Sequence, residues 1–232
     1  MEHFRPLSGR LLVLNFKTYI EATGKRAVDL ALLASKVSED SGVQVVVAPQ
    51  FTDIKAVSES AAVTVFSQHL DPIKPGAFTG HVLADAVKSA GAEGSLLNHS
   101  ERRISSSDIQ AGVKLCEQND LYSLVCSESA SASAEIASTK PDMIAIEPPD
   151  LIGTGISVSK TRPELITGSL HKIRSVNTTV RVLCGAGITT SEDVSTALKL
   201  GTEGVLVASS VVKSKDPRKV LVDMTDAIAN AE

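Results

Sequence analysis

Three chemically versatile side chains each follow a short, mostly apolar run of the sequence: Lys17, His99 and Glu147. A lysine can hold a negatively charged oxygen, and an imidazole can donate or accept a proton near neutral pH. A carboxylate at the end of a buried apolar run tends towards a raised pKa, which suits a general base. Together these residue types are suited to acid–base chemistry on a small anionic molecule.

Each of these residues also has a structural explanation. Lys17 could extend its ammonium into water at the end of a strand, as most lysines do. The polar cluster Asn98–Arg103 could cap the next helix, with His99 as a hydrogen-bonded filler, and for this cluster alone the two explanations are evenly balanced. The other histidines have no comparable setting and are expected to be structural: His3, His69, His81 and His171.

Small residues follow two further apolar runs and indicate a place for a phosphate group. The segments are Gly185–Gly187 and Ala208–Ser210. Backbone N–H groups of small residues can approach an anion closely, and helix N-termini favour bound anions. Each segment alone could be tight packing, but their joint placement favours a phosphate site. Gly153–Gly155 gives a weaker signal of the same kind.

The elements that must position these groups alternate along the chain. Eight short runs are apolar on both faces, which is typical of parallel strands buried on both sides. Between them lie amphipathic stretches with helical spacing, such as the stripe of Val28, Leu32 and Val37, with helix starts at Ser105–Asp108 and Thr189–Glu192. The runs expected to be strands are Leu11–Phe16, Val43–Ala48, Val63–Phe66, Gly94–Leu97, Leu121–Cys126, Met143–Ile146, Val180–Leu183 and Gly204–Val207.

This alternation allows two architectures, an open doubly wound sheet and a closed (β/α)8 barrel. Eight units in 232 residues leave about 29 residues for each, the size of one strand–helix unit. The nucleotide-binding glycine motifs of open sheets are absent from the sequence. We therefore expect one (β/α)8 barrel domain over residues 1–232, with its working residues at the carboxyl ends of the strands.

Composition excludes several other classes of protein. Hydrophobic residues make up 43% and the formal net charge is −4, so no basic surface for nucleic acid or an anionic membrane is expected. Aromatic residues are scarce, and no run approaches the roughly 20 apolar residues that span a bilayer. Three dispersed cysteines, no metal-binding cluster, no cofactor motif and no secretory signal indicate a cytoplasmic protein without a metal or cofactor.

Several blocks of the sequence resemble the triosephosphate isomerase family, and the similarity runs from the first strand to the eighth. Asn15–Lys17 is similar to the family's N-x-K motif, and Asn98–Arg103 to its [GN]-H-S-E-R-R block. Gly76–Gly80 resembles its third-loop motif, and Glu147–Gly155 resembles the catalytic glutamate with the phosphate-gripping lid. The asparagine at position 98 is typical of the archaeal branch. Together these blocks are specific, and they imply a TIM barrel.

The resemblance implies interconversion of dihydroxyacetone phosphate and D-glyceraldehyde 3-phosphate through an enediolate, in glycolysis and gluconeogenesis. Glu147 matches the proton-shuttling base, and His99 matches the electrophile, which in this family is a neutral imidazole. Lys17 matches the cation at the substrate oxygens, with Asn15 beside it. Behind these groups the resemblance places Ser100 and Glu101. The positions implied to bind the phosphate, largely through backbone N–H groups, are Ile152, Gly153, Gly187, Ala208 and Ser209.

The resemblance also implies self-association, as a dimer or a tetramer. In the family the third loop inserts into the neighbouring subunit near the N-x-K motif, and Thr79 is the matching tip residue. Some positions depart from the commonest pattern. Pro149 and Asp150 stand where many members have Val-Trp, and Ala208-Ser209 replaces two glycines. These changes bear on lid movement and phosphate affinity, because backbone donors survive them.

Two other functions fit a phosphate-binding barrel less well. A Schiff-base aldolase needs a strand-end lysine in a dry pocket, for which only Lys17 is available, and a metal epimerase needs ligand clusters that the sequence lacks. A barrel that binds phosphosugars without catalysis would have lost Glu147, His99 or Lys17, and all three are present. The sequence therefore favours the isomerase.

Overall fold

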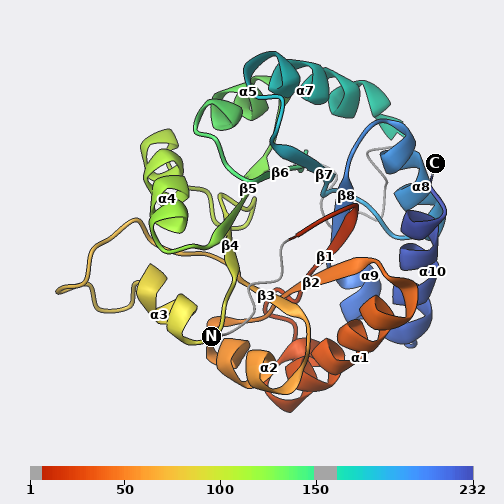
Figure 1. Ribbon diagram of the computed structural model, residues 1–232, viewed down its shortest axis with the longest axis horizontal. Coiled ribbons are helices and arrows are strands. Elements are labelled where there is room, and N and C mark those ends of the chain that lie inside the picture. The colour runs from red at the N-terminus through yellow and green to blue at the C-terminus, as the bar shows by residue number, and fades with distance from the viewer. Residues whose placement is uncertain (1–6, 149–160, 232) are drawn as a thin grey trace.

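A computed structural model describes residues 7–148 and 161–231 of the chain. Eight parallel strands form a closed barrel in which each strand pairs with the next and β8 hydrogen-bonds back to β1 (Figure 1). The prediction of a closed barrel is confirmed, and the open sheet is excluded. The strands are β1 (Leu11–Asn15), β2 (Gln44–Ala48), β3 (Thr64–Ser67), β4 (Gly94–Leu97), β5 (Tyr122–Ser127), β6 (Met143–Ile146), β7 (Arg181–Cys184) and β8 (Gly204–Val207).

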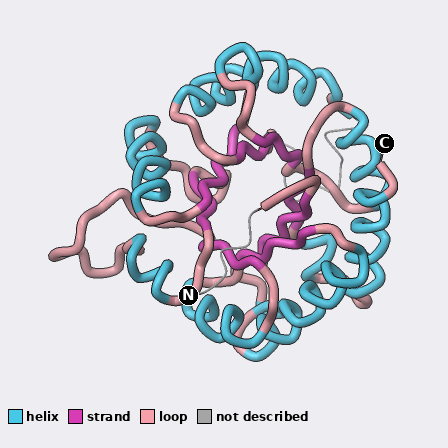
Figure 2. Tube along the Cα trace, viewed as in Figure 1, coloured by secondary structure: helices cyan, strands magenta, loops and turns pink. Residues whose placement is uncertain are grey.

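Helices surround the barrel as an outer ring (Figure 2). None of the helices in the described part of the chain is long and apolar enough to cross a membrane. The helices of the described residues are α1 (Lys25–Ser41), α2 (Ile54–Ser60), α3 (Ala84–Ser89), α4 (Ser106–Gln118), α5 (Ala130–Ser138), α7 (Pro163–Val176), α8 (Ser191–Lys199), α9 (Ser209–Val212) and α10 (Pro217–Ala229), with short 3-10 helices η1 (Ile20–Ala22) and η2 (Phe51–Asp53).

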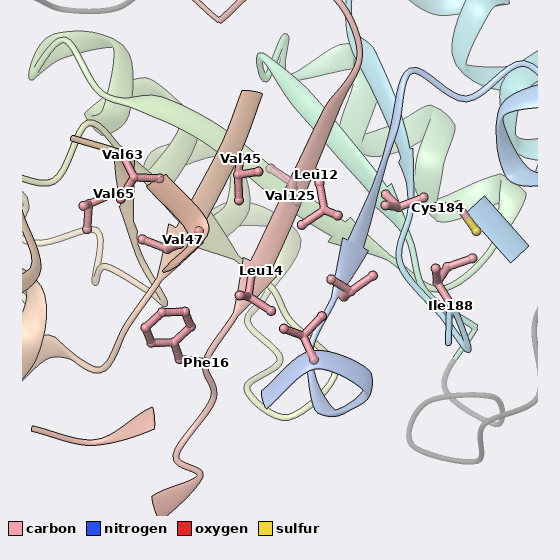
Figure 3. Close-up of a cluster of buried hydrophobic side chains, with 14 of the residues drawn as sticks. Leu12, Leu14, Phe16, Val45, Val47, Val63, Val65, Val125, Cys184 and Ile188 are labelled. Carbon is pink, nitrogen blue, oxygen red and sulfur yellow. The ribbon is translucent and has the colours of Figure 1, made fainter. Parts of the chain in front are cut away.

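Two apolar layers hold the barrel together, and the alternation of side chains along each strand separates them. In β1, Leu12 and Leu14 point outward and pack beneath the helices with Val45 and Val47 of β2 (Figure 3). Leu11 and Val13 of the same strand belong to a second cluster, which fills the barrel interior. Burial on both faces is the reason that each strand is a continuous apolar run rather than an alternating one.

Helix α1 buries a face that only partly matches the predicted stripe. Val37 is buried and Val28 packs against the core, but Leu32 is 45% exposed. The rest of the buried face carries Ala27, Leu30 and Ala34. Small side chains let the helix backbone approach the barrel closely, so the face that fits the curved strand layer is decided by close packing rather than by side-chain size.

Helix α8 begins at the expected place and orders the segment after β7. Thr190 caps the helix by accepting a hydrogen bond from the N–H of Asp193, and Asp193 accepts one from the N–H of Thr190 in return. The Asp193 carboxylate also accepts hydrogen bonds from the N–H and the hydroxyl of Thr189. Asp193 is buried, and its bonds therefore fix the backbone that leads from β7 to the helix.

The barrel closes where β8 meets β1, and a substitution at this seam tests the packing. A Cβ at Gly204 would lie 2.2 Å from the carbonyl oxygen of Leu11 and 3.0 Å from Leu183. We expect Gly204→Ala to lower the free energy of unfolding by about 2 kcal/mol or more, because backbone must move. Urea unfolding at one fixed protein concentration measures this.

The matched control is Gly168→Ala in α7, where an added Cβ meets nothing within 4 Å. It should stabilise the protein by about 0.5–1 kcal/mol, since alanine is the better helix former. An unchanged urea midpoint for Gly204→Ala would show that the seam is looser than these distances imply.

Candidate active site

A cavity of about 390 Å³ lies at the carboxyl ends of the strands. Side chains or backbone from β1, β4, β6, β7 and β8 meet there, as the closed barrel requires. Ile152 and Gly153, which were predicted to bind phosphate, lie outside the described residues, as do Pro149 and Asp150. The predicted site residues that line the cavity are Asn15, Lys17, His99, Glu147, Gly187, Ala208 and Ser209.

Lys17 reaches this cavity through a turn rather than through strand alternation. Strand β1 ends at Asn15, and Lys17 has a φ of 48°, in the left-handed region that a non-glycine residue rarely adopts. The side-chain carbonyl of Asn15 accepts a hydrogen bond from the N–H of Lys17 at 2.9 Å. The Lys17 ammonium lies 2.8 Å from a carboxylate oxygen of Glu101, which holds it at the rim of the barrel.

His99 follows β4 and points one ring nitrogen into the cavity. Its Nδ1 accepts a hydrogen bond from the N–H of Glu101 at 3.2 Å, so the proton of the neutral ring lies on Nε2. Nε2 is 3.7 Å from Oε1 of Glu147. The preceding Asn98 has a left-handed φ of 57°, and its amide bridges the carbonyl of Cys126 and the N–H of Ile104. These bonds fix the turn that carries the imidazole.

Glu147 is a buried carboxylate directly after β6, with 3% of its surface exposed. Burial raises its pKa above the usual value of 4.5, although the nearby His99 and Lys17 act in the opposite direction. The neighbouring Cys126 thiol also acts to lower the pKa of this carboxyl group. Its second oxygen, Oε2, is buried and has no hydrogen-bond partner among the described residues. A buried carboxylate with one oxygen that no described residue hydrogen-bonds can accept a proton from a bound molecule.

The far wall of the cavity is built from small residues and backbone. Gly187 has a φ of 69°, and α9 begins at Ser209 immediately after β8. The first N–H groups of a helix have no acceptor inside the helix, so they are available to an anion. The hydroxyl of Ser210 donates to the carbonyl of Ile188 at 3.1 Å and ties the two loops together. This wall has the character of a phosphate cup.

Ser100 and Glu101 stand behind the cavity rather than in its lining. Glu101 contacts both Lys17 and the ring of His99, with its second oxygen 3.6 Å from Nδ1. The hydroxyl of Ser100 is buried without a hydrogen-bond partner among the described residues. The Glu101 carboxylate therefore holds Lys17, and the backbone N–H of the same residue holds the ring of His99.

Sequence reasoning missed several lining residues, among them Tyr19, Ile188 and Thr189, whereas Ser210 falls in a predicted phosphate segment. Each lies within two residues of a predicted site residue, so extending each strand-end loop by two positions would have found them. The ammonium of Lys213 makes a cation–π contact with the ring of Tyr19, 4.3 Å from the ring centre.

A larger cavity, of about 790 Å³, lies at the opposite end of the barrel. The first residues of three strands line it, Tyr122, Met143 and Arg181, so it opens on the amino-terminal face. None of Lys17, His99 and Glu147 reaches it. Volume alone does not define an active site, and in this fold residues at the amino-terminal face serve stability.

The described residues contain no cluster of three or more His, Cys, Asp or Glu side chains that could hold a metal ion. What they bring together is a base, an imidazole, a cation and a cup of backbone donors at one rim. Fold and cavity together define an acid–base enzyme of the (β/α)8-barrel class.

Comparison with known proteins identifies the family within this class. The triosephosphate isomerase family matches residues 10–228. The chain therefore belongs to the triosephosphate isomerase family, a family of aldose–ketose isomerases. The resemblance drawn from the sequence motifs is confirmed.

The relatives agree in name and in length. A triosephosphate isomerase from Methanothermus fervidus is 50% identical over 92% of this chain and 96% of its own. One from Methanocaldococcus jannaschii is 47% identical over 92% and 98%. These organisms are methanogenic archaea, as the asparagine at position 98 indicated. Among solved structures, a triosephosphate isomerase from Bartonella henselae superposes with a TM-score of 0.75 over 95% of this chain and 99% of its own, at 19% identity, which supports the fold.

The position of the Glu147 side chain depends on a missing side chain at Gly185. A Cβ there would lie 2.5 Å from Cγ of Glu147 and 3.0 Å from Oε1. We expect Gly185→Ala to displace the carboxylate and to lower kcat by about 10- to 100-fold, with little change in the urea midpoint. Steady-state kinetics measures the loss, and Gly168→Ala in α7 is the control that should keep its kcat. Wild-type kcat in Gly185→Ala would show that the Glu147 carboxylate keeps its working position despite the added Cβ.

Proposed function

We propose that Glu147, His99 and Lys17 carry out the interconversion of dihydroxyacetone phosphate and D-glyceraldehyde 3-phosphate in the cavity of about 390 Å³. The observation that supports this most directly is the 3.7 Å separation of a buried carboxylate from the Nε2 of an imidazole whose other nitrogen is already occupied. Base and electrophile thus face the same small space, where a carbon acid and its carbonyl oxygen would both fit.

The reaction is a proton transfer in two halves. Glu147 takes a proton from the carbon next to the carbonyl, and the electron pair of that C–H bond moves to form the enediolate, with negative charge on the former carbonyl oxygen. The N–H of His99 and the ammonium of Lys17 stabilise that oxygen. Return of the proton from Glu147 to the neighbouring carbon, with transfer of the hydroxyl proton between the two oxygens, gives the isomeric product.

The phosphate group would occupy the cup formed by Gly187, Ala208 and Ser209. Ile152 and Gly153, which we also propose to bind phosphate, lie outside the described residues. Binding at a point remote from the reacting carbons fixes the orientation of the substrate, which lowers the barrier by removing motional freedom in advance. Asn15 holds the backbone of Lys17 from within the same cavity. Glu101 places Lys17 through its carboxylate and the ring of His99 through its backbone N–H, and Ser100 joins these two residues in the chain.

Schiff-base chemistry at the same site is disfavoured by the state of its lysine. Lys17 lies 2.8 Å from the Glu101 carboxylate. In this ion pair the Lys17 nitrogen is engaged by a carboxylate, whereas a Schiff-base lysine must direct its nitrogen at a carbonyl carbon. Lys17 is suited to binding an anion and not to acting as a nucleophile.

We also propose that the chain acts in the cytoplasm as an oligomer. The segment around Gly76–Gly80 extends away from the barrel body in the view down the axis (Figure 1), and Phe78 within it is 45% exposed. Ile20 of η1 and Phe51 of η2, in the segments that follow β1 and β2, are also exposed. Insertion of this loop, with Thr79 at its tip, into a second copy would cover apolar surface. The three cysteines are free and buried, as suits a reducing compartment.

A coupled isomerase assay with each triose phosphate tests the function, and Glu147→Gln tests the base. Glutamine keeps the shape of the side chain but cannot take a proton, so turnover should fall by about 10²–10⁴-fold. Binding of dihydroxyacetone phosphate, measured by calorimetry, should persist. Absence of turnover in the folded wild-type protein would refute the proposed activity, and full activity in Glu147→Gln would show that the base has been assigned wrongly.

The raised pKa of Glu147 sets a direction for the pH dependence. Only the carboxylate form is a base, so kcat/KM should fall as pH is lowered through a value above 4.5. For stability the sign is opposite: the folded state binds this proton more tightly than the unfolded state, so the contribution of Glu147 to stability falls as pH rises from 4.5 through the raised value. Glu147→Gln should remove this slope, as pH-dependent urea unfolding would reveal.

The oligomer is tested at Thr79. A charge at the tip of the loop would be buried without a partner in the proposed interface, so Thr79→Asp should shift the protein towards monomer. Analytical ultracentrifugation over a range of concentrations measures this. Thr178→Asp, at an exposed threonine elsewhere, is the control and should sediment as wild type. A wild-type protein that is monomeric at all concentrations would refute the proposal.

A further inference from the structure

Gln68 directly follows β3. It is not one of the described residues that line the cavity. Its side-chain amide nevertheless makes contacts that reach the site. Nε2 donates to the carbonyl oxygen of Lys17 at 2.8 Å and to that of Ala48 at 3.0 Å. It also lies 3.4 Å from the side-chain oxygen of Asn15. One amide nitrogen thus joins the ends of three neighbouring strands.

The geometry uses the full donor capacity of this amide. A glutamine nitrogen carries two N–H bonds, and the two shorter contacts satisfy both. The carbonyl of Ala48 also accepts the N–H of Phe16 at 3.0 Å, as the last bond that extends the β1–β2 ladder. Gln68 therefore fastens the turn after β1 to the point where regular pairing with β2 ends.

The turn needs such a fastening because of the backbone at Lys17. Its left-handed φ of 48° is strained for a residue with a Cβ, and strained residues persist only where their surroundings hold them. Both polar groups flanking this backbone are held by side chains: Asn15 accepts from the N–H, and Gln68 donates to the carbonyl. Without the second bond, the residue is free to relax to an extended conformation, which would redirect the side chain.

We propose that Gln68 is a positioning residue for the cation of this site. It holds the backbone of Lys17 left-handed, so that the ammonium lies in the cavity beside Glu101, where it can stabilise the substrate oxygen. This inference rests on the proposed function, since it assigns a purpose to the position of Lys17. It gives Gln68 an effect on catalysis that acts through Lys17 alone.

The first test is a double-mutant cycle. Gln68→Met keeps the length of the side chain and removes both donors, and it should lower kcat/KM by about 10-fold or more. In a Lys17→Met background the same change should alter kcat/KM by less than about 2-fold, because the cation it positions is already gone. Equal losses in the two backgrounds would overturn the inference. Gln118→Met, at an exposed glutamine at the end of α4, is the matched control and should be neutral.

The second test needs no turnover and separates this inference from the proposed function. Calorimetry measures the affinity of dihydroxyacetone phosphate for Glu147→Gln and for Glu147→Gln combined with Gln68→Met. We expect at least about 10-fold weaker binding when Gln68 is replaced, with an unchanged circular dichroism spectrum. Equal affinity would refute the role of Gln68 while leaving the function intact. No binding to Glu147→Gln at all would count against the proposed function itself.

Discussion

Closure of the sheet is the constraint on which the rest of this structure depends. Because β8 pairs with β1, every strand has two neighbours, and all eight carboxyl ends meet at one rim. Residues that are 130 positions apart in the chain, Lys17 and Glu147, line one cavity for this reason. The pairing in turn depends on a glycine at the seam, where the carbonyl of Leu11 leaves no room for a Cβ at Gly204. The geometry of the site and the packing of the barrel therefore both depend on closure between β8 and β1.

The site that this closure creates works against the stability of the fold. Glu147 is buried with one oxygen that no described residue hydrogen-bonds, which is a cost in a folded protein. The Cβ-free Gly185 gives the carboxylate its space, and strained backbone at Lys17 and Asn98 places the cation and the imidazole turn. Such departures gather at functional sites because substrate, rather than the protein, completes their bonding.

The sequence allowed the barrel and most of the cavity to be predicted, and the reason lies in periodicity. Strand limits fall within one residue of the predicted runs, since burial on both faces makes each strand a continuous apolar segment. The conformation of Lys17 could not be predicted, because a left-handed turn, which has no periodic signal, follows Asn15. Helical spacing failed for Leu32, which is 45% exposed because close packing of alanines decided this part of the buried face. Gln68 escaped notice because its importance lies in bonds between strands that are distant in sequence.

The hydrogen bond from Gln68 to the carbonyl of Lys17 has a consequence for the design of this site in other barrels. The asparagine and the lysine stand two residues apart on one strand end, and they can be grafted as a short motif. The amide that holds the lysine carbonyl arrives from the third strand, about fifty positions later in the chain. A design that includes the short motif alone has the right residue types but lacks the bond that holds the lysine backbone left-handed. The smallest portable unit spans the first three strands, with the spacing between them preserved.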